Sequence, residues 1–240
     1  MRKLGIIGGA SWNSTALYYD QINRAVAQRL GGLHSARLVI ESLDFEDDYA
    51  CFHRSGDWSG AEKVIVGAAE RLKGAGAEGL LLGSNTMHKH YEAVAAATRL
   101  PVLHIGDATA ERMASDGVRS AALLGTRFTM SEPFLRERFE RRGIQLAELD
   151  PVWMQEIDRI IYEELAAGRI VRDSQRKLKT LITELGQRKK AKAIILGCTE
   201  LVMAVDTRAN VLPVYDTTAI HARSAVDWML APAEEARAAA

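Results

Sequence analysis

The chain has 240 residues, of which 48% are hydrophobic, and its 31 basic and 31 acidic residues give a formal net charge of zero. This length suits one large or two small globular domains with a sizeable core. A balanced charge argues against a general nucleic-acid or membrane-surface binder. No apolar run is long enough to span a membrane, and the N-terminus lacks a secretion signal. We therefore expect a cytoplasmic protein with no nucleic-acid or membrane partner.

The first residues predict a strand followed directly by a helix. Lys3–Ile7 is an apolar run typical of a strand, and the loop Gly8–Ser14 follows it. Asn13 or Ser14 is the predicted cap of the helix. The backbone N–H groups of this loop could hold an anion, or the loop could be a tight turn. Further strands are predicted at 37–43, at 78–84 and at 101–105, with a helix at 61–72.

A polar segment interrupts this pattern. Phe45–Trp58 shows no clear period and carries several charged residues. Such a segment is typical of a lid over a site. Within it, Arg54 has two interpretations, a clamp for a carboxylate or a surface arginine.

The second half repeats the alternation of strands and helices. This alternation predicts parallel sheets, and hence an α/β fold. Asp216 and Thr217 are the predicted caps of the last helix. Strands are predicted at 119–125, at 193–197 and at 211–215, and helices at 131–142, 153–165, 173–185 and 217–230.

Several landmarks occur twice, in the same order. Leu100–Val102 recurs as Leu212–Val214, and two apolar strands each end in a glycine followed by a small residue, Ser84 in one copy and Cys198 in the other. These pairs predict two similar α/β domains related by a pseudo-twofold duplication. The expected domains are 1–103 with 214–240, and 104–213. Ser84 and Cys198 would then face each other across a cleft that forms the active site.

Cys198 is the principal candidate for a reactive group. It follows a buried strand, at the edge of a parallel sheet where ligands bind. A helix N-terminus after Cys198 would lower the pKa of its thiol from about 8.5 and favour a nucleophile or a general base. Cys51 has the features of an ordinary structural thiol. No cluster of cysteines and histidines has the spacing of a zinc site.

Taken together, the motifs resemble a known enzyme family. Gly8–Trp12, Ser84–His88, Leu124–Thr126, Gly197–Glu200 and Pro213–Thr217 are similar to the motifs of the cofactor-independent aspartate/glutamate racemases. The resemblance implies two α/β domains, commonly a homodimer, and two thiols that flank the Cα of the substrate. It also implies that neither pyridoxal phosphate nor a metal takes part.

The resemblance assigns roles to individual residues. Cys198 matches the cysteine that handles the proton of the L-enantiomer. Asp216 is a weaker binding candidate. The resemblance does not assign the group that holds the distal carboxylate of the substrate, for which Arg54, His53 and Arg127 are the candidates, in that order. The resemblance implies that Asn85, Thr86, Thr199 and Ser11 bind the α-carboxylate of the substrate. The predicted substrate-binding residues also include Glu200, Arg54 and Thr126.

Ser84 departs from the family pattern, because most members carry a second cysteine there. A hydroxyl is a much weaker acid than a thiol, and each pKa unit of mismatch costs about 1.36 kcal/mol. A subgroup that resembles this chain has a hydroxyl residue at this position and acts on L-aspartate and L-glutamate. The other interpretation is a cysteine that has been replaced by serine. We expect Cys198 to remove the Cα proton, and the Ser84 side to return one.

Two other functions remain open. A one-cysteine decarboxylase of the arylmalonate type protonates an enolate with a single thiol, and its second half-site also lacks a thiol. The second alternative is an amino-acid binder that the loss of one thiol has inactivated. Exchange of the Cα proton distinguishes both alternatives from a racemase.

Overall fold

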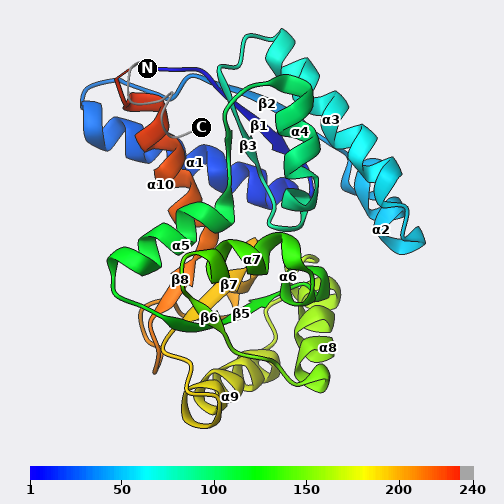
Figure 1. Cartoon of the computed structure of the whole chain (residues 1–240), viewed down its shortest axis with the longest axis vertical. Helices are drawn as coiled ribbons and strands as arrows, with labels where there is room; N and C mark the ends of the chain where they lie inside the picture. Colours follow the sequence, from blue (N-terminus) through cyan, green and yellow to red (C-terminus); the bar gives the residue numbers. More distant parts are fainter. Residues whose placement is uncertain (233–240) are drawn as a thin grey trace. The chain divides into compact units, whose positions relative to one another are not determined.

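In the computed structural model the described residues are 1–232, without the side chains of His53 and Arg54 (Figure 1). Contacts divide the chain into two compact units. The first unit holds Met1–His104 together with the chain from His221 onward, and the second holds Ile105–Ile220. Each unit contains one four-stranded parallel sheet with its own helices, as the alternation of elements predicts.

The sheet of the first unit has the strand order β2-β1-β3-β4. All of its pairs are parallel, and Ile6 of β1 lies between Ile40 of β2 and Leu81 of β3. The central strands are buried on both faces, which explains their unbroken apolar sequence. The strands are β1 (Leu4–Gly8), β2 (Leu38–Ser42), β3 (Gly79–Leu82) and β4 (Val102–Leu103).

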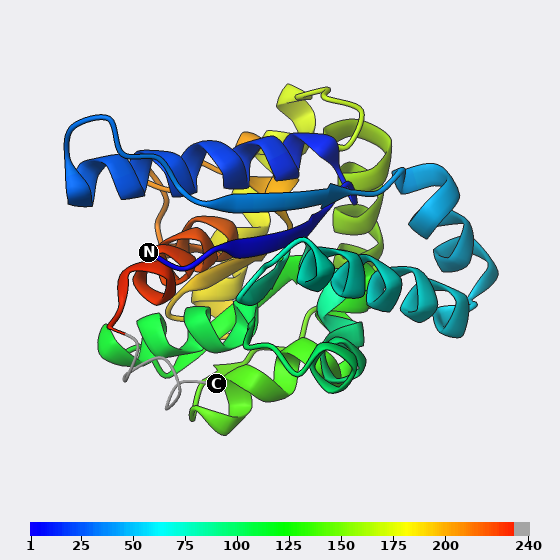
Figure 2. The same cartoon turned by 90° about the horizontal axis from the view of Figure 1, so that it is seen from above.

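Alternate residues of these strands pack against different helices. Ile6 and Leu81 pack with α1 and α10, whereas Ile7 and Leu82 pack with α3 and α4. This alternation follows from the two-residue period of a strand. Figure 2 shows α1 running along β1 and β2. The helices are α1 (Trp12–Leu30), α3 (Trp58–Gly74), α4 (Tyr91–Thr98) and α10 (Thr217–Leu230).

The second unit repeats this topology. Its strand order is β6-β5-β7-β8. In both sheets, the first strand of the unit lies between its second and third strands, and the fourth lies at the edge next to the third. Leu123 and Ile195 face α5 and α7, and Leu124 and Ile194 face α8 and α9. The predicted pair of similar α/β halves is confirmed. The elements are β5 (Ser120–Gly125), β6 (Gln145–Leu146), β7 (Ile194–Gly197), β8 (Val214–Asp216), α5 (Ile105–Ser115), α6 (Arg127–Ser131), α7 (Pro133–Arg141), α8 (Pro151–Arg159) and α9 (Arg172–Arg188).

The last strand lies in the second sheet, not in the first as the proposed boundary at 213/214 implies. Tyr215 of β8 pairs with Ile195 of β7. The repeated Leu-Pro-Val already contains this information, because Val102 begins β4, the last strand of the first sheet, and Val214 begins β8, the last strand of the second. The chain returns to the first unit only within α10.

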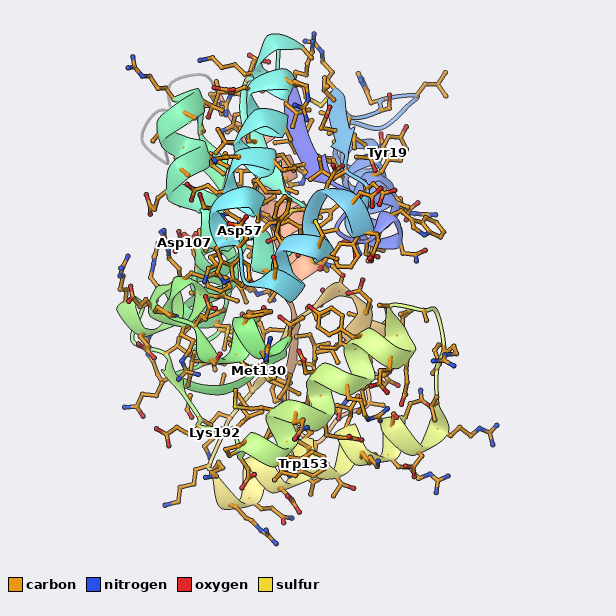
Figure 3. All side chains as sticks on the ribbon, turned by 90° about the vertical axis from the view of Figure 1, so that its right-hand side faces the viewer. Tyr19, Asp57, Asp107, Met130, Trp153 and Lys192 are labelled. Atoms are coloured by element: carbon orange, nitrogen blue, oxygen red, sulfur yellow. The ribbon has the colours of Figure 1, made fainter. Side chains whose placement is uncertain are left out.

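The polar segment Phe45–Trp58 is largely helical instead of irregular. It forms the π-helix η1 (Phe45–Ala50) and the short helix α2 (Cys51–Ser55). A π-helix has a wider turn than an α-helix, so its buried side chains do not follow the usual period. Tyr49 is buried against the core beside α3. Asp57, labelled in Figure 3, caps α3 by accepting a hydrogen bond from the Gly60 N–H at 2.9 Å.

The loop after β1 is a tight turn. Gly9 has φ +89°, and a Cβ there would lie 2.0 Å from the Leu43 carbonyl oxygen. Its N–H donates to Thr15 Oγ1 at 2.9 Å, so this amide is engaged within the protein. The helix that follows begins at Trp12, earlier than the predicted caps, with Ser11 in the N-cap position and no side-chain cap bond.

Two general expectations can be compared with the described residues. None of their helices is both long and apolar enough to cross a membrane. Cys51 and Cys198 are both free thiols, and Cys51 Sγ donates to the Asp47 carbonyl oxygen at 3.0 Å.

Candidate active site

Cys198 stands directly after β7, as the sequence predicts, and its thiol has a carboxylate partner. Cys198 Sγ donates to Glu200 Oε2 at 2.9 Å. The Thr199 hydroxyl donates to the same oxygen at 2.6 Å. Gly197 allows this turn, because a Cβ there would lie 2.9 Å from Leu123 Cδ1 and from Thr129 Cγ2. Three consecutive residues thus place two hydrogen-bond donors on one carboxylate oxygen.

The pKa of Cys198 moves in the opposite direction from the sequence prediction. Burial raises the pKa of the thiol well above its ordinary value, and the neighbouring Glu200 carboxylate raises it further. Backbone N–H groups of the following turn lower the pKa by less. The element after Cys198 is the five-residue 3₁₀-helix η4 (Thr199–Met203), which aligns few peptide dipoles. The raised pKa favours the thiol over the predicted thiolate.

This geometry also changes the interpretation of Glu200. A carboxylate would repel the carboxylates of an acidic substrate. The same group is well placed to accept the thiol proton, since Cys198 Sγ already donates to it. The sequence prediction that Glu200 binds substrate stays a prediction; its contact with Cys198 depends on backbone geometry that the motif does not reveal.

Tyr162 is a neighbour of this thiol that sequence reasoning missed. Burial raises the pKa of its phenol, and so do the negative charge of Asp158 and, when Cys198 is ionised, the charge of its sulfur. Arg127 acts in the opposite direction. Tyr162 belongs to the π-helix η3 (Ile160–Leu165), which continues α8. π-Helical turns often occur at functional sites, but only the structure reveals this one.

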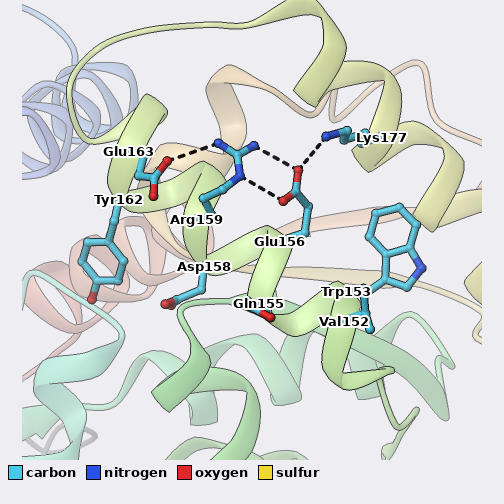
Figure 4. A pocket seen from close by; sticks show the side chains of 9 residues that line it. All are labelled: Val152, Trp153, Gln155, Glu156, Asp158, Arg159, Tyr162, Glu163 and Lys177. Atoms are coloured by element: carbon cyan, nitrogen blue, oxygen red, sulfur yellow. Dashed lines mark hydrogen bonds and ion pairs between the residues drawn. The ribbon is translucent and has the colours of Figure 1, made fainter.

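Tyr162 also lines a pocket of the second unit, with a volume of about 630 Å³ (Figure 4). Arg159 lies within it and contacts Glu156 at 2.9 Å, and Glu156 also contacts Lys177 Nζ at 2.8 Å. The Arg159 and Lys177 cations lower the pKa of Glu156 to about 2. The pocket is lined by Val152, Trp153, Gln155, Glu156, Asp158, Arg159, Tyr162, Glu163 and Lys177.

Two predicted site residues follow β5. The Thr126 hydroxyl caps α6 by accepting from the Thr129 N–H at 3.5 Å and lies 3.1 Å from Thr129 Oγ1. The Arg127 backbone N–H donates to Asp158 Oδ1 at 2.8 Å. The Arg127 guanidinium is exposed and lies 4.7 Å from the centre of the Phe128 ring. No ion pair within the described part of the chain engages this guanidinium.

Ser84 occupies the equivalent strand end of the first unit. Gly83 precedes it, and a Cβ there would lie 2.9 Å from the Ile7 carbonyl oxygen. Ser84 is half-buried, while Asn85 and Thr86 are almost fully buried. The 3₁₀-helix η2 (Thr86–His90) follows. The hydrogen bonds of the described residues include none to the Ser84 hydroxyl, in contrast to the Cys198 thiol.

A cluster of buried histidines lies next to Ser84. His88 Nδ1 is 2.9 Å from the Ser84 carbonyl oxygen, and its ring centre lies 4.6 Å from that of His104 and 5.5 Å from that of His221. His221 Nε2 faces the Leu103 carbonyl oxygen at 3.0 Å, and its Nδ1 faces the Tyr18 hydroxyl at 2.9 Å. Burial, followed by the charge of His88, lowers the pKa of His221 to about 3.

The remaining predicted residues lie at the starts of helices, or have side chains that are not among the described ones. Asp216 Oδ1 accepts from the N–H groups of Thr218 at 2.9 Å and Ala219 at 3.1 Å, so it caps α10 as predicted. Ser11 lies at the start of α1. The side chains of His53 and Arg54 lie outside the described residues. Among the residues that the structure describes, no group of three or more His, Cys, Asp or Glu is arranged for a metal ion.

These features define an α/β protein of two similar units, with hydroxyl and thiol side chains at equivalent strand ends. A profile of the Asp/Glu/Hydantoin racemase family matches residues 7–225. This match spans most of the chain, and the chain therefore belongs to that family.

Named relatives match over nearly their full length. A candidate Asp/Glu racemase from Yersinia pestis is 43% identical, with a TM-score of 0.89, over 96% of this chain and 100% of that one. An aspartate racemase homologue from Pyrococcus horikoshii OT3 is 32% identical, with a TM-score of 0.80, over 95% of this chain and 98% of that one. RacX of Bacillus subtilis (strain 168), a broad-specificity amino-acid racemase, is 26% identical over 95% of this chain and 98% of the relative.

Proposed function

We propose that this protein is a cofactor-independent racemase of acidic amino acids that acts on L-aspartate and L-glutamate. The observation that carries the proposal is the hydrogen bond from Cys198 Sγ to Glu200 Oε2 at 2.9 Å, at the end of a buried parallel strand. Family membership supports racemisation as the reaction. The catalytic roles of Cys198 and Ser84 and the acidic substrate are parts of the proposal.

The first step makes the base. Substrate binding removes water around Cys198, and Glu200 takes the thiol proton along the hydrogen bond that already joins them. The S–H bond breaks as an O–H bond forms on the carboxylate. The thiolate then removes the Cα proton of the L-amino acid, so the Cα–H bond breaks and an S–H bond forms.

The second step returns a proton to the opposite face of Cα. The Ser84 hydroxyl delivers it while taking up another proton from water, so that no free alkoxide is formed. Glu200 finally releases its extra proton to solvent, which restores the starting state. Donors near Ser84 stabilise the negative charge that develops on the substrate carboxylate between the two steps; Asn85 and Thr86 are the proposed groups.

Equilibrium limits what the weak Ser84 acid can do. The two enantiomers have equal free energies in solution, so the kcat/KM values of the two directions must be equal. A preference for L-substrates can therefore appear only as unequal kcat and KM values that compensate each other. Strict one-way conversion would contradict this constraint.

Arg127 supports an acidic substrate. Its exposed guanidinium forms no ion pair among the described residues. Arg127 and Cys198 both affect the pKa of Tyr162, which Arg127 lowers and Cys198 raises. An arginine can bind a carboxylate with two parallel hydrogen bonds. A broad substrate range, as in the name of the relative RacX, is the competing possibility.

The deciding experiment is proton NMR of the Cα–H signal in D₂O, combined with optical rotation. L- and D-aspartate and L- and D-glutamate are each incubated with the wild type and with Cys198→Ala. L-asparagine and L-glutamine are uncharged analogues that test acidic specificity. Cys51→Ala is the matched control, because it removes the other thiol.

We expect loss of both the Cα–H signal and the optical purity for an acidic L-substrate, abolished in Cys198→Ala and retained in Cys51→Ala. Equal turnover of the amides would establish broad specificity instead. Exchange without inversion would indicate that Ser84 cannot complete the reaction. If none of the four acids exchanges its Cα proton, the proposal fails, and arylmalonate decarboxylation or simple amino-acid binding becomes the next test.

A further inference from the structure

We propose that His88 is a positioning residue that fixes the peptide between Ser84 and Asn85 for the second step of the reaction. This inference rests on the proposed function. His88 was part of the sequence motif, yet sequence reasoning gave it no role in the site. Its buried ring contacts the backbone of the reprotonating residue directly, with His88 Nδ1 2.9 Å from the Ser84 carbonyl oxygen.

The direction of this hydrogen bond follows from its acceptor. A carbonyl oxygen can only accept, so Nδ1 carries the hydrogen and donates it to Ser84. The ring cannot turn away easily, because His104 and His221 pack beside it, with centres 4.6 Å and 5.5 Å away. His88 is almost fully buried, and its backbone N–H also bonds the Asn85 carbonyl oxygen at 3.1 Å. The turn after β3 is thus tied to η2 at two points.

The hydrogen bonds of His221 fix the tautomer of its own ring, which packs beside His88. Its Nε2 must carry a hydrogen, because it faces the Leu103 carbonyl oxygen at 3.0 Å. Its Nδ1 then accepts from the Tyr18 hydroxyl at 2.9 Å. Both ring nitrogens of a neutral imidazole are therefore used, and the ring is a fixed, uncharged neighbour of His88.

The fixed carbonyl determines where the other side of the same peptide points. The peptide between Ser84 and Asn85 is trans, as are the others of the described residues, so the Asn85 N–H is directed opposite to the Ser84 C=O within one planar group. A bond from His88 to the carbonyl therefore directs the Asn85 N–H away from the histidine cluster. It also polarises the peptide, which strengthens that N–H as a donor.

This arrangement matters most in the second step. The Ser84 hydroxyl is a weak acid, so it must meet the substrate carbanion in a fixed geometry. A polarised Asn85 N–H binds the substrate carboxylate more strongly as negative charge builds up on it. The effect of His88 should therefore fall on kcat more than on KM.

A matched pair of variants separates positioning from packing. His88→Phe keeps an aromatic ring of similar size but loses the Nδ1 donor. His88→Asn loses the ring, whereas its Nδ2 can occupy the place of Nδ1 and keep the donor. Packing predicts that His88→Asn is the worse variant, and positioning predicts that His88→Phe is.

The readouts are kcat and KM for racemisation of L-glutamate or L-aspartate, thermal melting, and the alkylation rate of Cys198 by iodoacetamide in a Cys51→Ala background. The alkylation rate shows whether a substitution at His88 also disturbs the surroundings of Cys198 at the end of β7. We expect His88→Phe to lose roughly 100-fold in kcat with KM changed less than about threefold. His88→Asn should stay within about fivefold of wild-type kcat despite a lower Tm, and alkylation should be unchanged in both.

The inference is overturned if His88→Phe keeps wild-type kcat, if both variants lose activity in proportion to Tm, or if the loss appears only in KM. An altered alkylation rate in either variant would also overturn it, because the effect would then not be confined to the Ser84 end. The wild type is assayed first. An inactive wild type would remove the proposed function and this inference with it, whereas an active wild type with an unaffected His88→Phe removes only the inference.

Discussion

The strand ends that carry Ser84 and Cys198 share their backbone design and differ in their electrostatics. In both, a glycine precedes the serine or cysteine because a Cβ would collide with neighbouring atoms, and a five-residue 3₁₀-helix follows within a few residues. Cys198 then donates to a carboxylate, whereas Ser84 is held through its carbonyl by a buried histidine. Duplication of a fold thus conserves position, while the residues two to four places further on give each strand end different hydrogen-bond partners.

The largest expected difference between the units is in the pH dependence of stability. The pKa of His221 is lowered from 6.5 to about 3, so below pH 6.5 the unfolded chain takes up a proton that the folded chain does not. Stability should therefore fall between pH 6.5 and 3, by a total on the order of 4 kcal/mol. In the second unit, Glu156, with its pKa lowered from 4.5 to about 2, loses its contribution only below pH 4.5.

Urea unfolding from pH 7.5 to 4.5 measures this effect, with His221→Phe as the test variant. The variant should be less stable at pH 7.5, because the Tyr18 hydroxyl and the Leu103 carbonyl lose their partner, yet it should have a flatter pH slope. If the free energy of unfolding of the variant has the same pH dependence as the wild type between pH 6.5 and 4.5, His221 is not the source of that dependence.

The next prediction concerns the Cys198 end. Glu200→Gln removes the proposed proton acceptor and should lower kcat about 100-fold. It also removes a charge that raises the pKa of Cys198, so iodoacetamide should alkylate the thiol faster at pH 7.5. Glu137→Gln, which changes an exposed carboxylate on α7 of the second unit, is the control. Catalysis and alkylation that change in the same direction would contradict a base role for Glu200.

A smaller gain is expected when the two ends are made chemically alike. Ser84→Cys replaces a very weak acid by a thiol, and expression of even one pKa unit of that difference is worth about 1.36 kcal/mol, or tenfold. We expect kcat/KM to rise about tenfold and equally in both directions, measured by polarimetry from each pure enantiomer. A loss of activity would show that Ser84 does more than donate a proton, or that the wider sulfur does not fit beside His88.

The smallest effect is expected at the ionic surface of the second unit. Lys177 contacts Glu156 at 2.8 Å, but its side chain is 43% exposed. Exposed ion pairs contribute little, so Lys177→Met should change the free energy of unfolding by less than about 1 kcal/mol. Urea denaturation at low and high salt tests this, and a loss above about 2 kcal/mol would show that this network stabilises the unit as much as the histidine cluster stabilises the other.

The sequence by itself determined the architecture and the positions of Ser84 and Cys198 at the ends of strands. An apolar run that ends in glycine specifies a buried parallel strand, because a strand covered on both faces needs apolar residues throughout and the turn after it has no room for a Cβ. That local signal located Ser84 and Cys198 at strand ends, and its repetition indicated two similar units. The helices predicted at 61–72 and 173–185 form the central parts of α3 and α9. They could be predicted because their apolar residues recur with a regular helical period.

Three features depend on the tertiary structure alone: the sheet to which β8 belongs, the direction of the pKa shift of Cys198, and the histidines that pack against His88. β8 was ambiguous because strand pairing depends on long-range contacts. The thiol pKa depends on burial and on a carboxylate placed by a 3₁₀ turn, neither of which a motif contains. His221 reaches His88 from a distant part of the chain, so no local pattern could join them. The local sequence fixes where Ser84 and Cys198 stand, whereas their surroundings depend on neighbours that only folding brings together.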